Sequence, residues 1–186
     1  MPDGTRVYPF LNPADSTNDL PPELSPGASV ALGEVRPGHA SKIHMHPFVT
    51  MIVWVMSGRL SLRLKDKQSR TPYTLRLRAG EGALALPGTF LQLLNGSRTS
   101  CRVLYIASPA YVFLKVKRKI LYDDAIVVDA GWDELARLRW RAATASTLAA
   151  LRAARVRALR RLRTLKRKRL LSPPSRSRGR RARSGS

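Results

Sequence analysis

Two histidines in the first half of the chain are the residues best placed to do chemistry. His44 and His46 are two positions apart, just before an apolar run that begins at Thr50. On an extended backbone, residues two apart point to the same face, so both imidazoles would face one site. Two imidazoles on one face can ligate a single metal ion. The pair predicts a metal or ligand site, and the alternative is a pair that bonds only to water or backbone.

Short segments with the character of β-strands surround the histidines. Arg59–Lys65 and Tyr73–Arg78 alternate basic and apolar residues, which is typical of strands with one face in a core and one in water. The continuous apolar run at 50–56 suits a strand buried on both sides. The other expected strands cover residues 28–36, 83–86, 90–94, 102–107, 111–116, 120–121 and 125–128. Many short strands separated by Gly and Pro predict a sandwich or a closed barrel.

Two motifs in this series resemble those of the cupin superfamily. The first cupin motif is matched in spacing by Gly38, His44 and His46. Five residues separate Gly38 from His44, one residue separates the two histidines, and a strand that ends at Gly58 follows them. PGTFLQLLN at 87–95 resembles the turn and strand of the second motif. CRVLYIASPAYVF and the later LYDDAIVVD resemble a stretch of uncharacterised bacterial cupin-domain proteins. The resemblance implies an all-β fold, a cupin-type double-stranded β-helix (jelly-roll) barrel, and pairing into a homodimer.

The chain departs from the usual cupin metal site. That site takes two histidines and a glutamate from the first motif and a third histidine from the second. Here the glutamate position falls on Thr50 or Met51, and the third histidine position falls on Leu91, beside Gln92. Two imidazoles with the carbonyl of Gln92 would make a weak site for Fe, Mn, Zn, Ni or Cu, because non-haem iron centres need a carboxylate. The sequence leaves open both a divalent transition metal and no cofactor.

Inward-facing side chains of the expected barrel would either line a pocket or fill it. The candidates for a ligand pocket are Met51, Val53, Trp54, Leu84, Leu91 and Tyr105. Small barrels often have interiors filled by side chains, so simple core packing is the alternative for all six. Asp123 and Asp124 are adjacent, would face opposite ways on a strand, and are expected in a turn or at an edge.

Extensions flank the barrel, which is expected over residues 28–131. Residues 1–27 hold six prolines and many polar residues, and predict an irregular leader. Leu and Ala recur at three- or four-residue steps over 132–171, with Arg on the other faces, which predicts a basic amphipathic α-helix that ends before Pro173 and Pro174. Residues 172–186 have nothing apolar to bury and predict a disordered tail.

Charge is concentrated at the C-terminal end. The net charge is +22, yet residues 1–134 carry 16 Lys and Arg against 12 Asp and Glu. The last 52 residues carry 18 Lys and Arg and no acidic residue. Three alternatives stand for this extension. It binds nucleic acid nonspecifically through residues 135–186, it associates with an anionic membrane surface, or it has no defined role. No base-reading motif or aromatic platform accompanies the arginines.

The rest of the sequence indicates a cellular compartment and lacks the motifs of several kinds of catalytic site. A single cysteine, Cys101, excludes an intramolecular disulfide, and no secretory signal or run of 18 apolar residues occurs. We therefore expect a cytoplasmic protein without a transmembrane segment. The sequence contains no Ser-His-Asp set, phosphate loop or zinc-type cysteine cluster, and whether the protein is an enzyme stays open.

Three functions compete at this stage. The first is a cupin-domain protein that binds a small molecule inside the barrel, with or without a divalent metal. The second is a metal-dependent cupin enzyme of the dioxygenase or isomerase type that uses His44, His46 and Gln92. The third is a nucleic-acid-associated protein that acts through its basic C-terminal tail. Because one fold hosts many activities, the fold alone does not choose among them.

Overall fold

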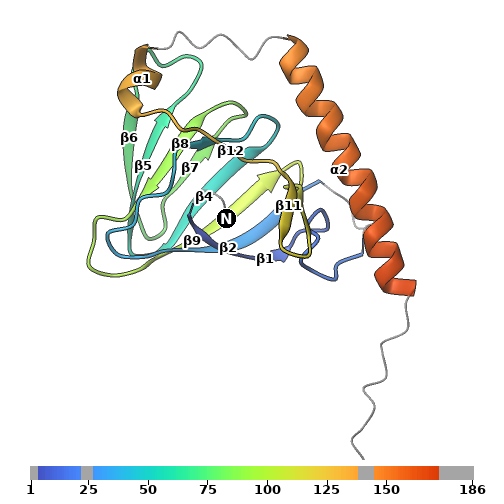
Figure 1. The fold of residues 1–186 in the computed structure, drawn as a ribbon. Coiled ribbons are helices and arrows are strands. Elements are labelled where there is room, and N and C mark those ends of the chain that lie inside the picture. The colour runs from blue at the N-terminus through green and yellow to red at the C-terminus, as the bar shows by residue number, and fades with distance from the viewer. Residues whose placement is uncertain (1–3, 22–26, 138–144, 172–186) are drawn as a thin grey trace, which may run out of the picture.

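The computed structural model describes residues 4–21, 27–137 and 145–171 (Figure 1). Two five-stranded sheets face each other, with strand orders β1-β2-β9-β4-β7 and β12-β3-β8-β5-β6, and β10 and β11 form a two-stranded ribbon. The strands are β1 (Arg6–Leu11), β2 (Ser29–Val35), β3 (His44–Met45), β4 (Thr50–Ser57), β5 (Arg59–Lys65), β6 (Tyr73–Arg78), β7 (Gly82–Ala85), β8 (Phe90–Leu94), β9 (Cys101–Ser108), β10 (Phe113–Val116), β11 (Lys119–Asp123) and β12 (Ile126–Val127). The expected all-β barrel is confirmed.

Buried apolar residues alternate with more exposed ones along the strands, and the buried residues form the core between the two sheets. Leu60, Leu62 and Leu64 of β5 are almost fully buried, and the residues between them are more exposed. Val53 and Val55 of β4 meet them from the opposite sheet in the same apolar cluster. The period of two in the sequence therefore identifies the inner face of β5 correctly.

One turn shows why glycine is needed between these strands. Gly58 joins β4 to β5 with φ of 84°, a backbone conformation that residues with a Cβ rarely adopt. A Cβ there would also lie 3.1 Å from Cα of Cys101. The tight turn lets β4 pass directly into β5 and so moves the chain from one sheet to the other.

The structure corrects the expectation for the N-terminal leader. Residues Arg6–Leu11 form β1, which pairs antiparallel with β2 and places Tyr8 opposite Leu32. Residues 12–16 then run beside β10, where the amide of Ser16 donates to the carbonyl of Phe113. The many prolines did not prevent an edge strand, because an edge strand leaves one row of N–H groups without strand partners.

The apolar run at 50–56 is also corrected. Met51, Val53 and Val55 are buried, but Ile52 and Trp54 between them are 37% and 43% exposed. Within the described residues, only one face of β4 is covered. The run therefore behaves like an ordinary alternating strand with an apolar outer face.

Two helices follow the barrel where the sequence predicted one over 132–171. They are α1 (Trp132–Arg137) and α2 (Ala145–Leu171), and residues 138–144 and the tail at 172–186 lie outside the described residues. Trp132 packs in a cluster with Ile43 and Phe90, whereas Ala158 and Leu162 of α2 pack on residues of β10 and its approach. Neither α1 nor α2 has the length and apolar character needed to cross a membrane.

Candidate functional site

A cavity of about 240 Å³ lies inside the barrel. Its wall is mostly apolar and includes Met51 and Val53 of β4 and Leu91 and Leu93 of β8. The polar side chains on the wall are Thr5, Asn12, Asp15, Thr17, Ser29, His44, His46, Tyr105, Tyr111 and Lys115. The volume exceeds that of a roughly 150 Å³ cavity that binds benzene, so a small ring-sized ligand fits.

The two histidines share one region of this wall. His44 opens the short strand β3, and His46 follows it on the same face of the backbone. Both side chains are buried and both line the cavity. Their ring centroids are 5.3 Å apart, with the ring planes at 80°. The structure thus brings together the two imidazoles that the sequence singled out.

His44 has its ring orientation fixed by the backbone. Its Nδ1 lies 2.9 Å from the carbonyl oxygen of Lys42. A carbonyl can only accept, so in the neutral ring Nδ1 carries the hydrogen and Nε2 is the acceptor nitrogen. This assignment of the tautomer follows from the hydrogen bond.

His46 is held in its neutral form. Burial and, to a lesser extent, the nearby His44 lower its pKa to about 3, while a backbone hydrogen bond with Asp124 acts in the opposite direction. The amide of Asp124 already donates to Val112, so the group that interacts with His46 is the carbonyl of Asp124. Nδ1 of His46 has no hydrogen-bond partner within the described part of the chain. The ring therefore donates through Nε2, and its Nδ1 is a buried acceptor on a side chain that lines the cavity.

Tyr105 reaches the cavity because the neighbouring strand carries a glycine. A Cβ on Gly33 of β2 would overlap the ring of Tyr105 and would lie 2.8 Å from Cγ2 of Val103. The absence of a side chain at Gly33 lets the ring lie over the backbone of β2. Gly33 thus acts on the shape of the cavity without lining it.

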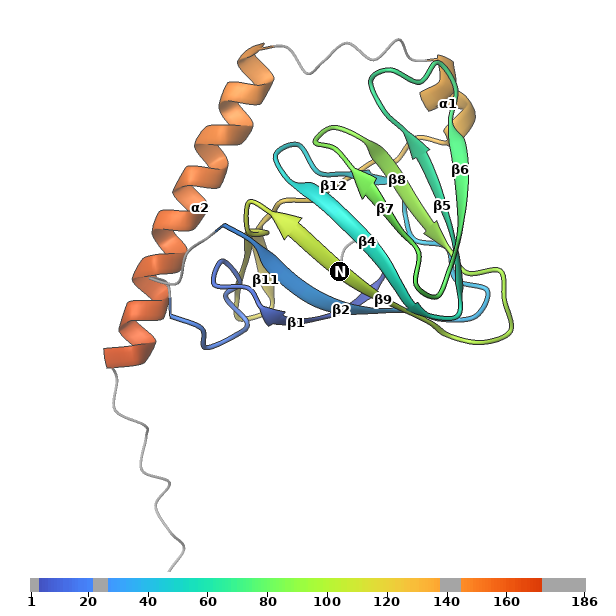
Figure 2. The ribbon, with the colours of Figure 1, turned by 180° about the vertical axis from the view of Figure 1, so that it is seen from behind.

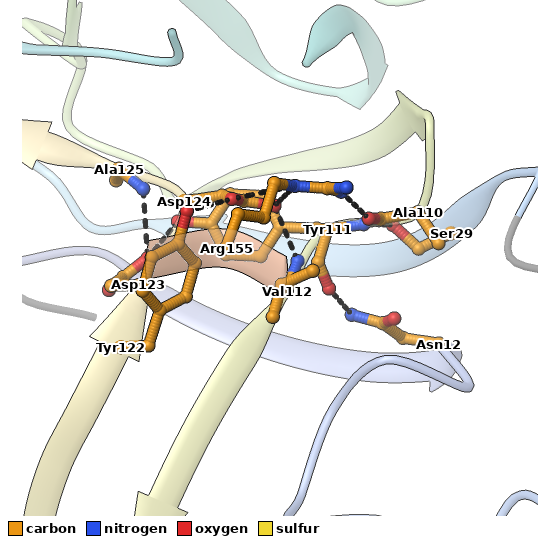
Figure 3. A network of polar contacts seen from close by, with 10 residues as sticks. All are labelled: Asn12, Ser29, Ala110, Tyr111, Val112, Tyr122, Asp123, Asp124, Ala125 and Arg155. Atoms are coloured by element: carbon orange, nitrogen blue, oxygen red, sulfur yellow. Dashed lines mark hydrogen bonds and ion pairs between the residues drawn. The ribbon is translucent and has the colours of Figure 1, made fainter. Parts of the chain in front are cut away.

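Tyr111 contacts His46 and also belongs to a polar network, and Figure 3 shows that network. The Tyr111 ring meets the His46 ring edge-on, with centroids 5.5 Å apart. The Tyr111 hydroxyl donates to Oδ1 of Asp123, which also accepts from the amide of Ala125. The carbonyl of Tyr111 accepts from the Asn12 side chain at 2.9 Å. Segments far apart in the sequence therefore fix the tyrosine that packs on His46.

Asp124 is the other centre of this network. Its carboxylate is fully buried, and it accepts from the amide of Val112 at 2.7 Å and from the Tyr122 hydroxyl at 2.9 Å. Nε of Arg155 in α2 lies 3.1 Å from its Oδ1. Burial raises the pKa of Asp124, while the Val112 amide and Arg155 oppose that rise. Asp123 and Asp124 take different partners, as adjacent residues in an extended segment would.

Three residues predicted for the site lie elsewhere. Gln92 faces away from the cavity, where its amide nitrogen donates to Ser41 and its Oε1 accepts from Nε1 of Trp132 at 2.7 Å. Trp54 faces the outside of the other sheet and rests on Gly82. Leu84 is 56% exposed, because Ala83 and Ala85 are the inward residues of β7. The other predicted pocket residues, Met51, Val53, Leu91 and Tyr105, line the cavity.

The described side chains around His44 and His46 do not provide the three ligands of a metal centre. His44 and His46 would supply two imidazole nitrogens, but the described residues include no group of three or more His, Cys, Asp or Glu that could hold a metal ion. Gln92 cannot complete the set in this conformation, since Trp132 and Ser41 occupy both ends of its amide. A metal at this place would have only two protein ligands.

Several residues on the cavity wall were missed by sequence analysis. Asn12, Asp15 and Thr17 come from the segment expected to be an irregular leader, and Lys115 comes from β10. Contacts with distant residues hold that segment in place. One is the hydrogen bond from the Asn12 side chain to the carbonyl of Tyr111, 99 positions away in the sequence. Short polar motifs give no local signal of such a distant partner.

No protein-family model matches the chain. A peptidyl-tRNA hydrolase of Frankia alni is 32% identical over 97 residues, which are 52% of this chain and 48% of that protein. The chain therefore spans about half the length of the curated relative it matches.

Solved structures resemble the barrel at low sequence identity. Peruvianin-I, a cysteine peptidase from Thevetia peruviana latex, is 14% identical and covers 68% of each chain at a TM-score of 0.52. A mutant of Bacillus subtilis oxalate decarboxylase is 21% identical, covers 67% of this chain and 28% of its own, and has a TM-score of 0.50. A cupin 2 conserved barrel domain protein from Salinispora arenicola is 18% identical, with coverages of 57% and 76% and a TM-score of 0.45. With its two facing antiparallel sheets and its cupin-like first motif, the chain has the double-stranded β-helix fold of the cupin superfamily.

Proposed function

We propose that the barrel binds a small, mostly apolar molecule whose hydrogen-bond donor is received by Nδ1 of His46. The observation that carries the proposal is this buried acceptor, which has no partner among the described residues and belongs to a side chain that lines the cavity. A buried polar atom without a partner costs free energy, and native proteins satisfy nearly all such atoms. A ligand that donates a hydrogen bond would remove that cost.

The geometry restricts the chemical class of the ligand. The wall formed by Met51, Val53, Leu91 and Leu93 favours an apolar ring or a branched hydrocarbon. A neutral imidazole accepts from an O–H or N–H group but offers no charge to a carboxylate. A neutral molecule with one hydroxyl, such as a phenol, meets both conditions. A cavity of about 240 Å³ has room for one such molecule.

The test compares two probes of nearly equal shape on the full chain. Phenol and toluene differ chiefly in the hydroxyl, and binding is followed by calorimetry with wild type, His46→Phe and the matched control His39→Phe. We expect phenol to bind wild type and the control alike, and to bind His46→Phe about fivefold more weakly, the equivalent of roughly 1 kcal/mol for one hydrogen bond. Toluene should bind all three equally.

The proposal fails if neither probe enters the cavity or if His46→Phe binds phenol as wild type does. His39 is a suitable control because it is partly buried and does not line the cavity. We propose binding without a metal, because the donor set supplies two ligands only. A metal-dependent dioxygenase or isomerase would need a third ligand that the described residues do not bring to His44 and His46.

A second candidate function is nucleic-acid binding by α2. The helix contains no acidic residue, and its exposed cations are Arg152, Arg157, Arg160, Arg161, Arg163, Arg167, Lys168 and Arg169. Cations spaced along a helix neutralise phosphates and release counterions, which makes binding weaken steeply with salt. The name of the Frankia relative, a peptidyl-tRNA hydrolase, agrees with an RNA partner.

The second candidate is tested by charge reversal at exposed positions. The triple variant Arg157→Glu/Arg160→Glu/Arg163→Glu is compared with Arg76→Glu/Arg78→Glu, which changes exposed arginines of β6. Affinity for a fluorescent RNA hairpin is measured across salt concentrations. We expect the slope of log affinity against log salt to fall by about one for each lost phosphate contact in the α2 variant only. Equal slopes in both variants would reject a role for α2.

A further inference from the structure

The turn between β10 and β11 concentrates positive charge. Four of the five residues from 115 to 119 are basic, and all four of these side chains are exposed. They are Lys115, Lys117, Arg118 and Lys119. Within the described residues none of them forms an ion pair. Because neighbouring like charges repel one another, folding alone gives no reason to place three consecutive cations at a tight turn.

The backbone at Lys117 is unusual for a lysine. Lys117 has a φ of 55°, and it is the only residue other than glycine with a positive φ in the part of the chain that the structure describes. Glycine adopts this left-handed conformation without steric cost, and asparagine adopts it more readily than most residues with a side chain. A lysine here costs free energy, and such backbone outliers gather at functional sites. The geometry of the turn therefore does not explain why a lysine stands at this position.

Helix α2 lies along the ribbon of β10 and β11 and reaches this turn. In its first half Arg155 contacts Asp124, which directly follows β11, and near its end Arg169 donates to the carbonyl of Ser16 at 3.1 Å. Ser16 lies beside the turn, because its hydroxyl accepts from the amide of Lys115 at 2.7 Å. Figures 1 and 2 show α2 on the β11 side of the barrel. The C-terminal half of α2 therefore lies next to the cations of the turn.

The outward side of α2 adds further cations beside the turn. Ala158 and Leu162 are buried against β10 and its approach, and the exposed basic residues of the same half include Arg157, Arg160, Arg161, Arg163 and Arg169. Two acidic residues of the N-terminal segment, Asp15 and Asp19, act on the buried Lys166, where burial lowers the pKa and their charges oppose that effect. The exposed cations of residues 115–119 and 157–169 together are the basic surface.

We propose that the turn and α2 form one surface that binds the phosphate backbone of a double-helical nucleic acid. This role of the turn rests on the second candidate function, nucleic-acid binding by α2, and adds a second contact to it. Lysine and arginine neutralise phosphates and release condensed counterions, which gives affinity that does not depend on base sequence. Since the contacts of Arg155 and Arg169 fix α2 against the barrel, both parts of the basic surface are in place before binding.

Two features of α2 favour a double helix over other anionic partners. Surfaces for single-stranded nucleic acid carry aromatic side chains on which bases stack, but α2 contains no aromatic residue. The aromatic residues of the ribbon, Phe113 and Tyr122, are buried and half-buried. A basic helix on a membrane buries its apolar face at the lipid boundary, whereas the apolar face of α2 packs on the barrel. The outward side of α2 is therefore suited to phosphates.

The experiment neutralises the turn in the full chain and measures affinity for a fluorescent RNA hairpin across salt concentrations. The turn variant is Lys117→Asn/Arg118→Gln/Lys119→Gln, in which asparagine suits the left-handed backbone. We expect its affinity in about 0.15 M salt to be roughly tenfold weaker. The slope of log affinity against log salt should fall by about two to three, one for each lost phosphate contact.

The control removes the same charge from exposed positions on β5 and β6, in Arg59→Gln/Arg76→Gln/Arg78→Gln. Screening confines such charges to a range of about 8 Å at this ionic strength, so the control should bind as wild type does. The exchange Lys117→Arg/Arg118→Lys/Lys119→Arg keeps all three charges and should also bind as wild type does.

A single substitution separates binding from folding. Lys117→Asn relaxes the backbone and removes one charge, so its melting temperature should rise while its affinity for the hairpin falls. A folding defect would lower both. Unchanged affinity in Lys117→Asn and in the turn variant would overturn the proposal.

The remaining outcomes distinguish the turn from α2. If the charge-reversal variant of α2 lowers the salt slope and the turn variant does not, α2 binds nucleic acid without the turn, and only the role of the turn is rejected. If neither variant lowers the slope, the second candidate function fails as well. Unpaired RNA of the same length that binds as tightly as the hairpin would reject a double-helical partner. Binding to vesicles with anionic lipids but not to RNA would reject nucleic acid altogether.

Discussion

Nε of Arg155 lies 3.1 Å from Oδ1 and 3.2 Å from Oδ2 of Asp124, and this pair joins α2 to the barrel beside the cavity (Figure 3). The second terminal nitrogen of Arg155 donates to the carbonyl of Ala110 at 2.7 Å. Asp124 in turn interacts with His46 through its backbone. The helix therefore supports the wall that carries the buried acceptor, even though α2 contributes no residue to that wall.

Removing Arg155 should destabilise the fold strongly. In Arg155→Leu the buried carboxylate of Asp124 would lose its cation, a change that costs about 3–5 kcal/mol at buried pairs. Urea denaturation should therefore show a free energy of unfolding lower by about 3 kcal/mol. The control Arg157→Leu is exposed on the same helix and should change it by less than about 0.5 kcal/mol. Equal stability of the two variants would mean that the pair contributes nothing net.

The fold could be predicted from sequence where strands alternate. Arg59–Lys65 and Tyr73–Arg78 have the expected bounds, because alternating basic and apolar residues fix both the strand and its buried face. Strand β1 was missed because its partner β2 lies about 20 residues away, and prolines hide the pattern. The interaction of Arg155 with Asp124 was missed for the same reason, since local spacing gives no information on a partner 31 positions distant.

The site could be predicted in part. His44 and His46 follow from spacing two residues apart on an extended backbone. The same alternation argues against Gln92, because its neighbour Leu91 faces the cavity and adjacent residues face opposite ways. It also argues against Trp54, which follows the inward Val53. The unpaired acceptor Nδ1 of His46 could not be predicted, because it depends on which ring nitrogen the backbone of Asp124 contacts.

Acid should destabilise the protein through His46. The pKa of His46 is about 3 in the folded state and near 6.5 when unfolded, so between these values the unfolded chain binds one more proton. Stability should therefore be complete above pH 6.5 and fall as the pH drops toward 3, by about 1.4 kcal/mol per pH unit from this group alone.

The comparison of variants isolates that contribution. His46→Phe has no such group, so the unfolding free energy of wild type should fall relative to that of His46→Phe as the pH drops from 6.5 to 4.5. Parallel profiles for wild type and His46→Phe would show that His46 takes up its proton at the same pH in the folded and unfolded states.

Gly33 should control the shape of the cavity. A methyl group at this position overlaps the Tyr105 ring, so Gly33→Ala should displace the ring and lower the free energy of unfolding by about 1–3 kcal/mol. Gly96→Ala is the matched control, since nothing lies within 4 Å of its Cβ position. If the cavity binds phenol as proposed, Gly33→Ala should change the affinity and Gly96→Ala should not. Unchanged stability and affinity in Gly33→Ala would mean that Tyr105 yields without cost.

Metal content should separate ligand binding from metal chemistry. Because His44 and His46 have no third ligand among the described residues, the full chain purified without a tag should hold less than about 0.1 equivalent of Fe, Mn, Zn, Ni or Cu by elemental analysis. Chelation should leave its melting temperature and its affinity for phenol unchanged. The contrary result is one equivalent of metal that is lost in His44→Ala/His46→Ala and kept in His39→Ala. Gln92 would then have to leave Ser41 and Trp132 to reach the site, and Trp132→Phe, which frees Oε1 of Gln92, should raise metal affinity.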